Sequence, residues 1–137
     1  MRILGLDLGT KTIGVAISDP LGWTAQGVRT IQRVGLKKDI EEIKAIIEEY
    51  KVEKIVLGMP KNMNGTVGEA GERSLAFAEN LKNKTGLEII LQDERLTTAA
   101  AHRTLIEADM SRKKRKKVVD TVAATYILQT YLDKNSR

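Results

Sequence analysis

The chain has 137 residues, of which 42% are hydrophobic and 30% are charged, and its net charge at pH 7 is +5. This length and composition predict a single globular domain over residues 1–137. The absence of cysteine excludes disulfides, zinc–thiolate sites and cysteine nucleophiles. The sequence has neither an apolar run of the roughly 18 residues that a membrane span needs nor a signal-peptide pattern at its start. We therefore expect a cytoplasmic protein without a membrane partner.

An aspartate interrupts the first apolar segment. Asp7 lies between Leu6 and Leu8, and the turn at residues 9–12 leads to a second apolar run at 13–17. These two runs predict a β-hairpin, and residues 23–32 predict a third strand. A carboxylate in a buried strand loses its hydration, so it needs hydrogen bonds, protonation or a bound cation. Asp7 therefore either caps the turn through an Asx-type hydrogen bond or helps to bind a metal or a phosphate.

The rest of the chain alternates between helical and strand patterns. Apolar spacing predicts helices and strands in this order: helix 37–50, strand 54–58, helix 69–84, strand 88–92, helix 97–108 and helix 116–132. Three strands that turn back on one another, followed by two strands joined through helices, predict an α/β fold. We expect a mixed five-stranded sheet with three antiparallel strands, then two parallel ones, and with helices on both faces.

The positive charge is concentrated in one place. Six consecutive residues are basic: Arg112, Lys113, Lys114, Arg115, Lys116 and Lys117. The other 17 basic residues face 18 acidic ones, so this basic block accounts for the whole excess. A compact basic block on a nearly neutral body is typical of a surface that contacts nucleic-acid phosphates. The alternative is a solvated helix start.

Further acids occupy positions where charge is costly. Asp120 lies on the apolar face of the last predicted helix, where the helix dipole or Lys116 and Lys117 would be its structural partners. Asp93 and Glu94 follow a core strand, at the sheet edge where ligands of α/β folds bind. Asp7, Glu94 and Asp120 could thus converge on one site. Oxygen ligands suit Mg²⁺ or Mn²⁺, and two such ions about 3.5–4 Å apart can promote phosphodiester hydrolysis.

Four segments resemble, in order, the motifs of the bacterial YqgF (RuvX) family: GLDLGTKTIGVAISD at 5–19, GMPKNMNG at 58–65, DERLTT at 93–98 and DTVAA at 120–124. The resemblance extends over nearly the whole chain. The family is similar to the RuvC-type resolvases, so the resemblance implies the ribonuclease H-like fold. Its members are described as Holliday-junction resolvases and as nucleases that process the 5′ end of precursor 16S rRNA in ribosome biogenesis.

The resemblance implies that Asp7, Glu94 and Asp120 are metal-binding catalytic acids. Ribonuclease H-like enzymes commonly carry an acid at the end of the fourth strand, whereas this chain has Gly58 there. The Asp93–Glu94 pair must then supply that ligand, and the choice between the two acids stays open.

Two more basic residues lie near the predicted site. Lys11, in the first turn, is expected to contact substrate phosphate together with the basic block. Arg95 either binds the scissile phosphate or pairs with Asp93.

The expected function is hydrolysis of structured nucleic acid, most simply precursor 16S rRNA. The alternatives are cleavage of four-way DNA junctions and a non-catalytic RNA-binding module. An actin-like kinase shares the Asp-Leu-Gly-Thr motif, but it needs a second domain for which 137 residues leave no room. The sequence leaves open whether the protein is a monomer or a homodimer.

Overall fold

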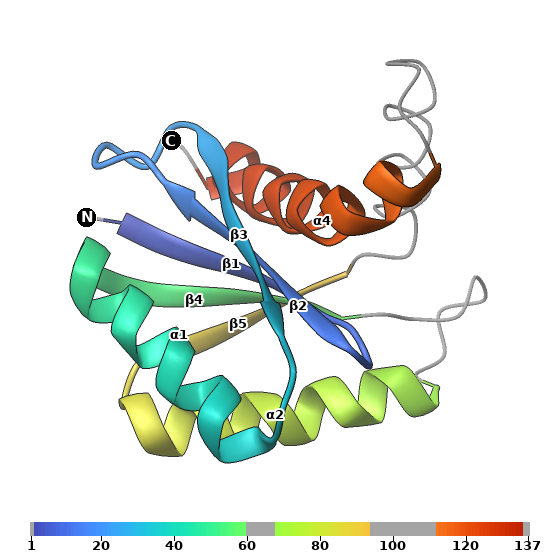
Figure 1. The fold of residues 1–137 in the computed structure, drawn as a ribbon. Coiled ribbons are helices and arrows are strands. Elements are labelled where there is room, and N and C mark those ends of the chain that lie inside the picture. Colours follow the sequence, from blue (N-terminus) through green and yellow to red (C-terminus); the bar gives the residue numbers. More distant parts are fainter. Residues whose placement is uncertain (1, 60–67, 94–111, 136–137) are drawn as a thin grey trace.

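A computed structural model describes residues 2–59, 68–93 and 112–135, with side chains described except at 93 and 112–120. The elements run β1 (Arg2–Leu8), β2 (Thr12–Ser18), β3 (Ala25–Gln32), α1 (Leu36–Tyr50), β4 (Val52–Met59), α2 (Glu69–Thr85), β5 (Glu88–Asp93) and α4 (Arg112–Asn135). Figure 1 shows one sheet between two layers of helices. Among these residues no helix is long and apolar enough to cross a membrane.

The sheet has the predicted mixed topology. Its strand order is β3-β2-β1-β4-β5, in which β2 pairs antiparallel with β1 and with β3. The later strands β4 and β5 join in parallel. The order places β1 in the middle of the sheet, which explains why its residues from Ile3 to Asp7 are buried.

Most predicted boundaries agree with the structure to within two residues, and one is clearly wrong. The last helix begins at Arg112 rather than at 116, so the basic block belongs to α4. Lysine and arginine have straight side chains that lose little freedom in a helix, which explains why charge does not delay its start. The predicted helix 97–108 lies outside the described residues. At the end of α2, Gly86 adopts a left-handed conformation with φ 75°, and its N–H bonds to the carbonyl of Lys82, as a helix-ending glycine should.

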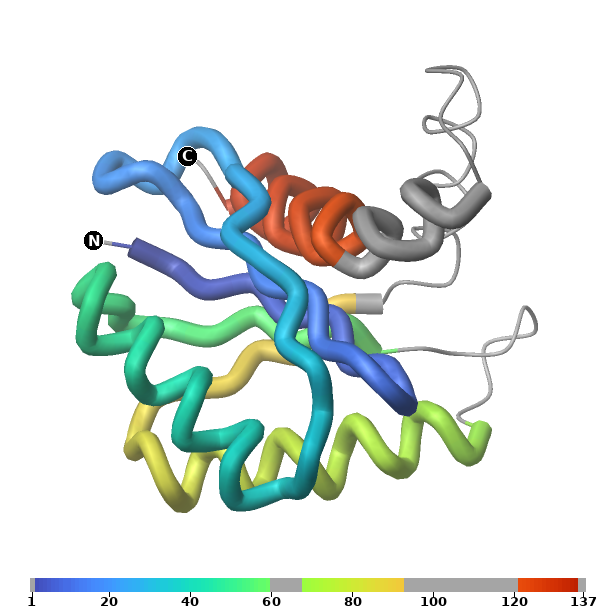
Figure 2. The backbone as a smooth tube through the Cα atoms, viewed as in Figure 1, coloured from blue at the N-terminus to red at the C-terminus, as the bar shows by residue number. Residues whose placement is uncertain are grey.

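The two faces of the sheet carry different helices. Helices α1 and α2 cover one face and α4 covers the other (Figures 1 and 2). Side chains alternate along β1, because successive residues of a strand point to opposite faces. Leu4 and Leu6 pack into the α1/α2 core, whereas Ile3 packs under α4. The same alternation puts Asp7 on the α4 face.

Helix α4 lies close to the sheet and antiparallel to β3. The Ala25 N–H donates to Gln129 Oε1 (2.9 Å), and the hydroxyls of Thr30 and Thr121 are 2.8 Å apart. Residue numbers thus increase along β3 in the direction in which they decrease along α4. Since β3 runs parallel to β1 through two antiparallel pairings, α4 begins at the end of the molecule where β1 finishes.

Candidate active site

Asp7 lies one residue before the end of β1 and is 8% exposed. Its partner in β2 is Gly14, which has no side chain to fill the space beside the carboxylate. On the other side of Asp7 lies β4. Leu6 pairs with Leu57 there, so the next residue, Gly58, lies beside Asp7 in the same row of residues across the sheet. The carboxylate therefore lies in the middle of the sheet with a glycine beside it on each neighbouring strand.

Asp120 occupies a matching place on α4. A Cβ added to Gly5 would lie 2.7 Å from Leu128 Cβ and 3.2 Å from the Ala124 carbonyl oxygen, so this part of α4 lies directly over Gly5. Two residues along β1 from Gly5 is Asp7, about 6.6 Å further. Four residues back along α4 from Ala124 is Asp120, about 6 Å in the same direction. The backbone thus brings the positions of Asp7 and Asp120 to one end of the molecule.

Strand register fixes the position of Asp93, the last residue of β5. Ile90 packs with the α4 side of the core and Ile89 with the α1/α2 side. Asp93 pairs with Met59, one residue beyond the row that contains Asp7 and Gly58. By alternation the position of Asp93 belongs to the face opposite Asp7. Glu94 and Arg95 lie outside the described residues.

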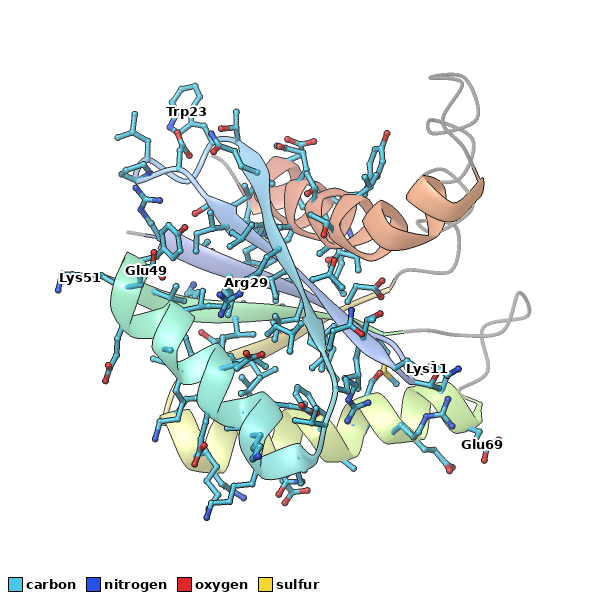
Figure 3. The ribbon with its side chains drawn as sticks, in the orientation of Figure 1. Lys11, Trp23, Arg29, Glu49, Lys51 and Glu69 are labelled. Carbon is cyan, nitrogen blue, oxygen red and sulfur yellow. The ribbon has the colours of Figure 1, made fainter. Side chains whose placement is uncertain are left out.

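The predicted phosphate-binding residues lie near the same end. Lys11 is exposed at the β1–β2 turn (Figure 3), which an N–H bond from Gly9 to the Thr12 carbonyl closes at 2.8 Å. The basic block, Arg112–Lys117, forms the start of α4. Trp23, 64% exposed, lies at the opposite end of the molecule from Lys11 (Figure 3), so it is remote from this turn.

Gln92 is a residue that the sequence did not single out. It pairs with Gly58, in the row of Asp7, and it is 8% exposed. A buried amide beside this row can donate to or accept from a ligand. The available signal was a polar residue in an otherwise apolar strand, but the pairing with Gly58 depends on long-range register.

The metal prediction is not tested by these side chains. No group of three His, Cys, Asp or Glu residues that could hold a metal occurs among the described side chains. Two of the three predicted ligands, Glu94 and Asp120, are not among those side chains. The predicted roles of Asp7, Glu94 and Asp120 thus stay predictions.

Comparison with solved structures identifies the fold. The fowlpox virus resolvase in complex with Holliday junction DNA aligns with a TM-score of 0.63 at 13% identity, covering 100% of both chains. T. thermophilus RuvC in complex with a Holliday junction substrate aligns with a TM-score of 0.61 at 10% identity, covering 99% of this chain and 96% of RuvC. These similarities confirm the predicted ribonuclease H-like fold.

Comparison of sequences identifies the family. A Clostridium tetani protein named "Putative pre-16S rRNA nuclease" is 65% identical over 133 residues, 97% of this chain and 96% of the relative. A Clostridioides difficile protein of the same name is 64% identical over 132 residues, 96% of this chain and 94% of the relative. The sequence model of the family described as "RuvX: Holliday junction resolvase" matches residues 1–134. The chain therefore belongs to the RuvX family, a family of nucleases and resolvases, as its four motifs predict.

Proposed function

We propose that the protein is a nuclease that uses divalent metal to process precursor 16S rRNA in the cytoplasm, with Asp7, Glu94 and Asp120 as its metal ligands. The observation that carries this proposal is the place of Asp7: a buried carboxylate near the end of the central strand, between Gly14 and Gly58. A carboxylate at this place can ligate a divalent cation through its oxygens, and the glycines on both sides put no side chain beside it.

Register argues against Asp93 as the third ligand. Its position shares the row of Met59, which lies on the face of the sheet opposite Asp7. We therefore assign this role to Glu94, the adjacent acid in the sequence, whose side chain is one methylene longer.

The donor set fits a hard divalent cation. Three carboxylates provide only oxygen ligands, which Mg²⁺ and Mn²⁺ prefer. When bound, such ions supply an activated water and charge stabilisation for the leaving oxygen. The chain's own contribution is to hold Asp7 on a strand that is paired on both sides, so that the carboxylate needs little rearrangement before the reaction.

The start of α4 supports a nucleic-acid partner. Its first turn contains no acidic residue and begins with the basic block. Cations at a helix N-terminus oppose the helix dipole, which favours negative charge there. Phosphate groups relieve both this conflict and the mutual repulsion of the six cations. In this proposal Lys11 and Arg95 contact phosphates nearer to the acids.

The names of the relatives favour precursor 16S rRNA as the substrate, whereas the family description names the Holliday junction. Backbone contacts carry no sequence information, so the basic block suits either polymer. We therefore keep junction cleavage as the second candidate.

The test compares the wild type with Asp7→Asn on a precursor 16S rRNA fragment and on a four-way DNA junction, with Mn²⁺. Asp7→Asn keeps the shape of the side chain and removes its charge. We expect cleavage of the RNA to be lost in the variant and in EDTA, with binding retained. Preferential cleavage of the junction would support the second candidate. Equal cleavage by both proteins, or binding without cleavage by the wild type, would contradict the proposed site.

A binding experiment tests the basic block separately. Replacing Arg112–Lys117 with glutamine should weaken RNA binding and flatten its dependence on salt, because fewer counterions are released. Affinity is measured in a salt series with Asp7→Asn as the background, so that no substrate is cleaved. An unchanged slope would show that the block is only a solvated helix start.

A further inference from the structure

An ion pair between a half-buried arginine and a buried aspartate lies beside the β1–β2 turn. The Arg33 Nε donates to Asp39 Oδ2 at 3.1 Å, and the Asp39 side chain is 1% exposed. The other carboxylate oxygen, Oδ1, accepts from the Val34 N–H at 3.1 Å. Arg33 follows β3 and Asp39 lies in the first turn of α1. The pair thus joins the edge of the sheet to the helix that covers it.

Arg33 also holds the turn at two points. Its Nη1 donates to the Gly9 carbonyl at 2.9 Å, and its backbone N–H donates to the Lys11 carbonyl at 2.9 Å. The turn cannot carry a larger residue at Gly9, because an added Cβ would lie 2.9 Å from the Thr12 carbonyl oxygen. The residue that follows β3 thus fixes both sides of a tight turn that starts two residues after Asp7.

The guanidinium has a third support. Its central carbon lies 5.7 Å from the centre of the Phe77 ring, in cation–π geometry. Carboxylate, carbonyl and ring together define the orientation of the group. Arginine can satisfy them at once because its planar fork presents several N–H groups in fixed directions, whereas lysine offers a single ammonium.

We propose that Arg33 is a positioning residue for the active site: held by Asp39 and Phe77, it fixes the β1–β2 turn and thereby the Asp7 carboxylate and Lys11. The inference rests on the proposed function, since it assigns Arg33 a role in placing the groups used there. Arg33 approaches the turn from the α1/α2 side of the sheet, while Asp7 lies on the α4 face. It therefore acts through the backbone and does not itself touch the reacting atoms.

Arg33→Lys is the informative variant. Lysine keeps a positive charge beside buried Asp39, but it cannot also hold the Gly9 carbonyl in the same geometry. The matched control is Ile46→Val, which removes one methylene from the same core at a buried position of α1. Both variants are compared at a temperature well below their melting points.

We expect Arg33→Lys to lower kcat by about 10-fold to 100-fold, the usual effect of disturbing a residue that orients a metal ligand. KM for the RNA should stay near the wild-type value, and the amides of Gly9–Thr12 should exchange hydrogen faster. Ile46→Val should leave both kcat and the exchange of these amides at their wild-type values. If Arg33→Lys does not fold, Phe77→Leu, which removes the ring contact and keeps an apolar side chain in the core, should show the same changes with smaller magnitude.

The inference would be overturned if Arg33→Lys and the control had the same kcat and the same rate of amide hydrogen exchange in the turn. Hydrogen exchange can be measured without cleavage, so it tests whether Arg33 stabilises the turn even if the proposed function fails. A wild type that does not cleave would instead overturn the proposed function.

Discussion

The two faces of the sheet are built differently. Under α1 and α2 the core consists of large aliphatic side chains together with Phe77. Under α4 a smaller cluster combines large aliphatic residues such as Ile127 and Leu128 with small ones: Ala16 and Ala124 are buried, and Gly5 and Gly27 lie directly beneath the helix. Where the helix lies this close to the strand backbone, an added carbon must displace a neighbour, so the helix has little freedom to slide. The first face thus provides most of the stability, and the second fixes the position of the helix that carries Asp120.

The largest loss of stability should come from the α1/α2 face. Ile43 on α1 is fully buried among the large side chains. Ile43→Ala should lower the free energy of unfolding by about 2–5 kcal/mol, through lost burial and a residual cavity. Denaturant unfolding measures the loss, and kcat measured where the variant is fully folded should stay close to wild type. A fall in kcat under those conditions would contradict the division between the faces.

On the α4 face a smaller loss of stability should accompany a larger loss of activity. A Cβ added at Gly27 would clash with Thr121 Cγ2, so Gly27→Ala must displace the Thr121 side chain, α4 or β3. Overpacking of this kind costs about 1–3 kcal/mol. Because Thr121 follows Asp120, cleavage should fall more than stability predicts.

A second substitution tests that explanation. Thr121→Ser removes the clashing methyl group and keeps the hydroxyl that meets Thr30. The double variant Gly27→Ala/Thr121→Ser should recover both cleavage and stability. Recovery of stability without recovery of cleavage would show that the position of α4 is not what limits activity.

Removing the hydroxyl contact itself should have a modest effect. Thr30→Val keeps the shape of the side chain but ends the 2.8 Å contact with Thr121. We expect a loss of about 1 kcal/mol in unfolding free energy. Thr121 is partly exposed, so water can replace the lost partner. Thermal melts against wild type measure the difference, and a loss above that of Gly27→Ala would reverse the proposed ranking.

The smallest effect concerns the turn between β2 and β3, which also contacts α4. Asp19 Oδ1 accepts N–H bonds from Trp23 (2.6 Å) and Thr24 (3.2 Å). The Trp23 bond lowers the pKa of Asp19 below its usual 3.8. A lowered pKa adds stability above 3.8 that is lost as the pH falls through the folded-state value. Since the Trp23 carbonyl accepts from Gln129 of α4, this turn also touches the helix.

The variant Asp19→Asn checks this pH dependence. Its melting temperature should fall less steeply than that of the wild type as the pH is lowered below 3.8. At neutral pH the variant should melt slightly lower, because a neutral amide oxygen is a weaker acceptor for the two N–H groups. Parallel curves for the two proteins would show that the turn is not the source of the acid sensitivity.

The sequence was sufficient for most of the described elements and for the mixed topology of the sheet, because apolar periodicity and turn residues are local signals. It also identified Asp7 as an anomaly, since a charged residue in an apolar strand is visible without a structure. It could not show that Gly14 and Gly58 flank Asp7, or that Asp93 lies one row away, because those facts depend on pairing between distant strands. The Arg33–Asp39 pair was missed for a related reason: its meaning comes from the Gly9 carbonyl, 24 residues away.

Helix α4 is the last element of the chain to be synthesised, and this affects how the protein folds. The strands it covers are complete by residue 93, while α4 begins at Arg112 and packs through Leu132. Domains begin to fold during synthesis, at about 5–20 residues per second, so one apolar face of the sheet stays open for several seconds after its strands have emerged. A nascent chain at that stage also lacks Asp120. The same late helix would then both close the fold and complete the proposed active site, so that an unfinished chain is unable to cut RNA.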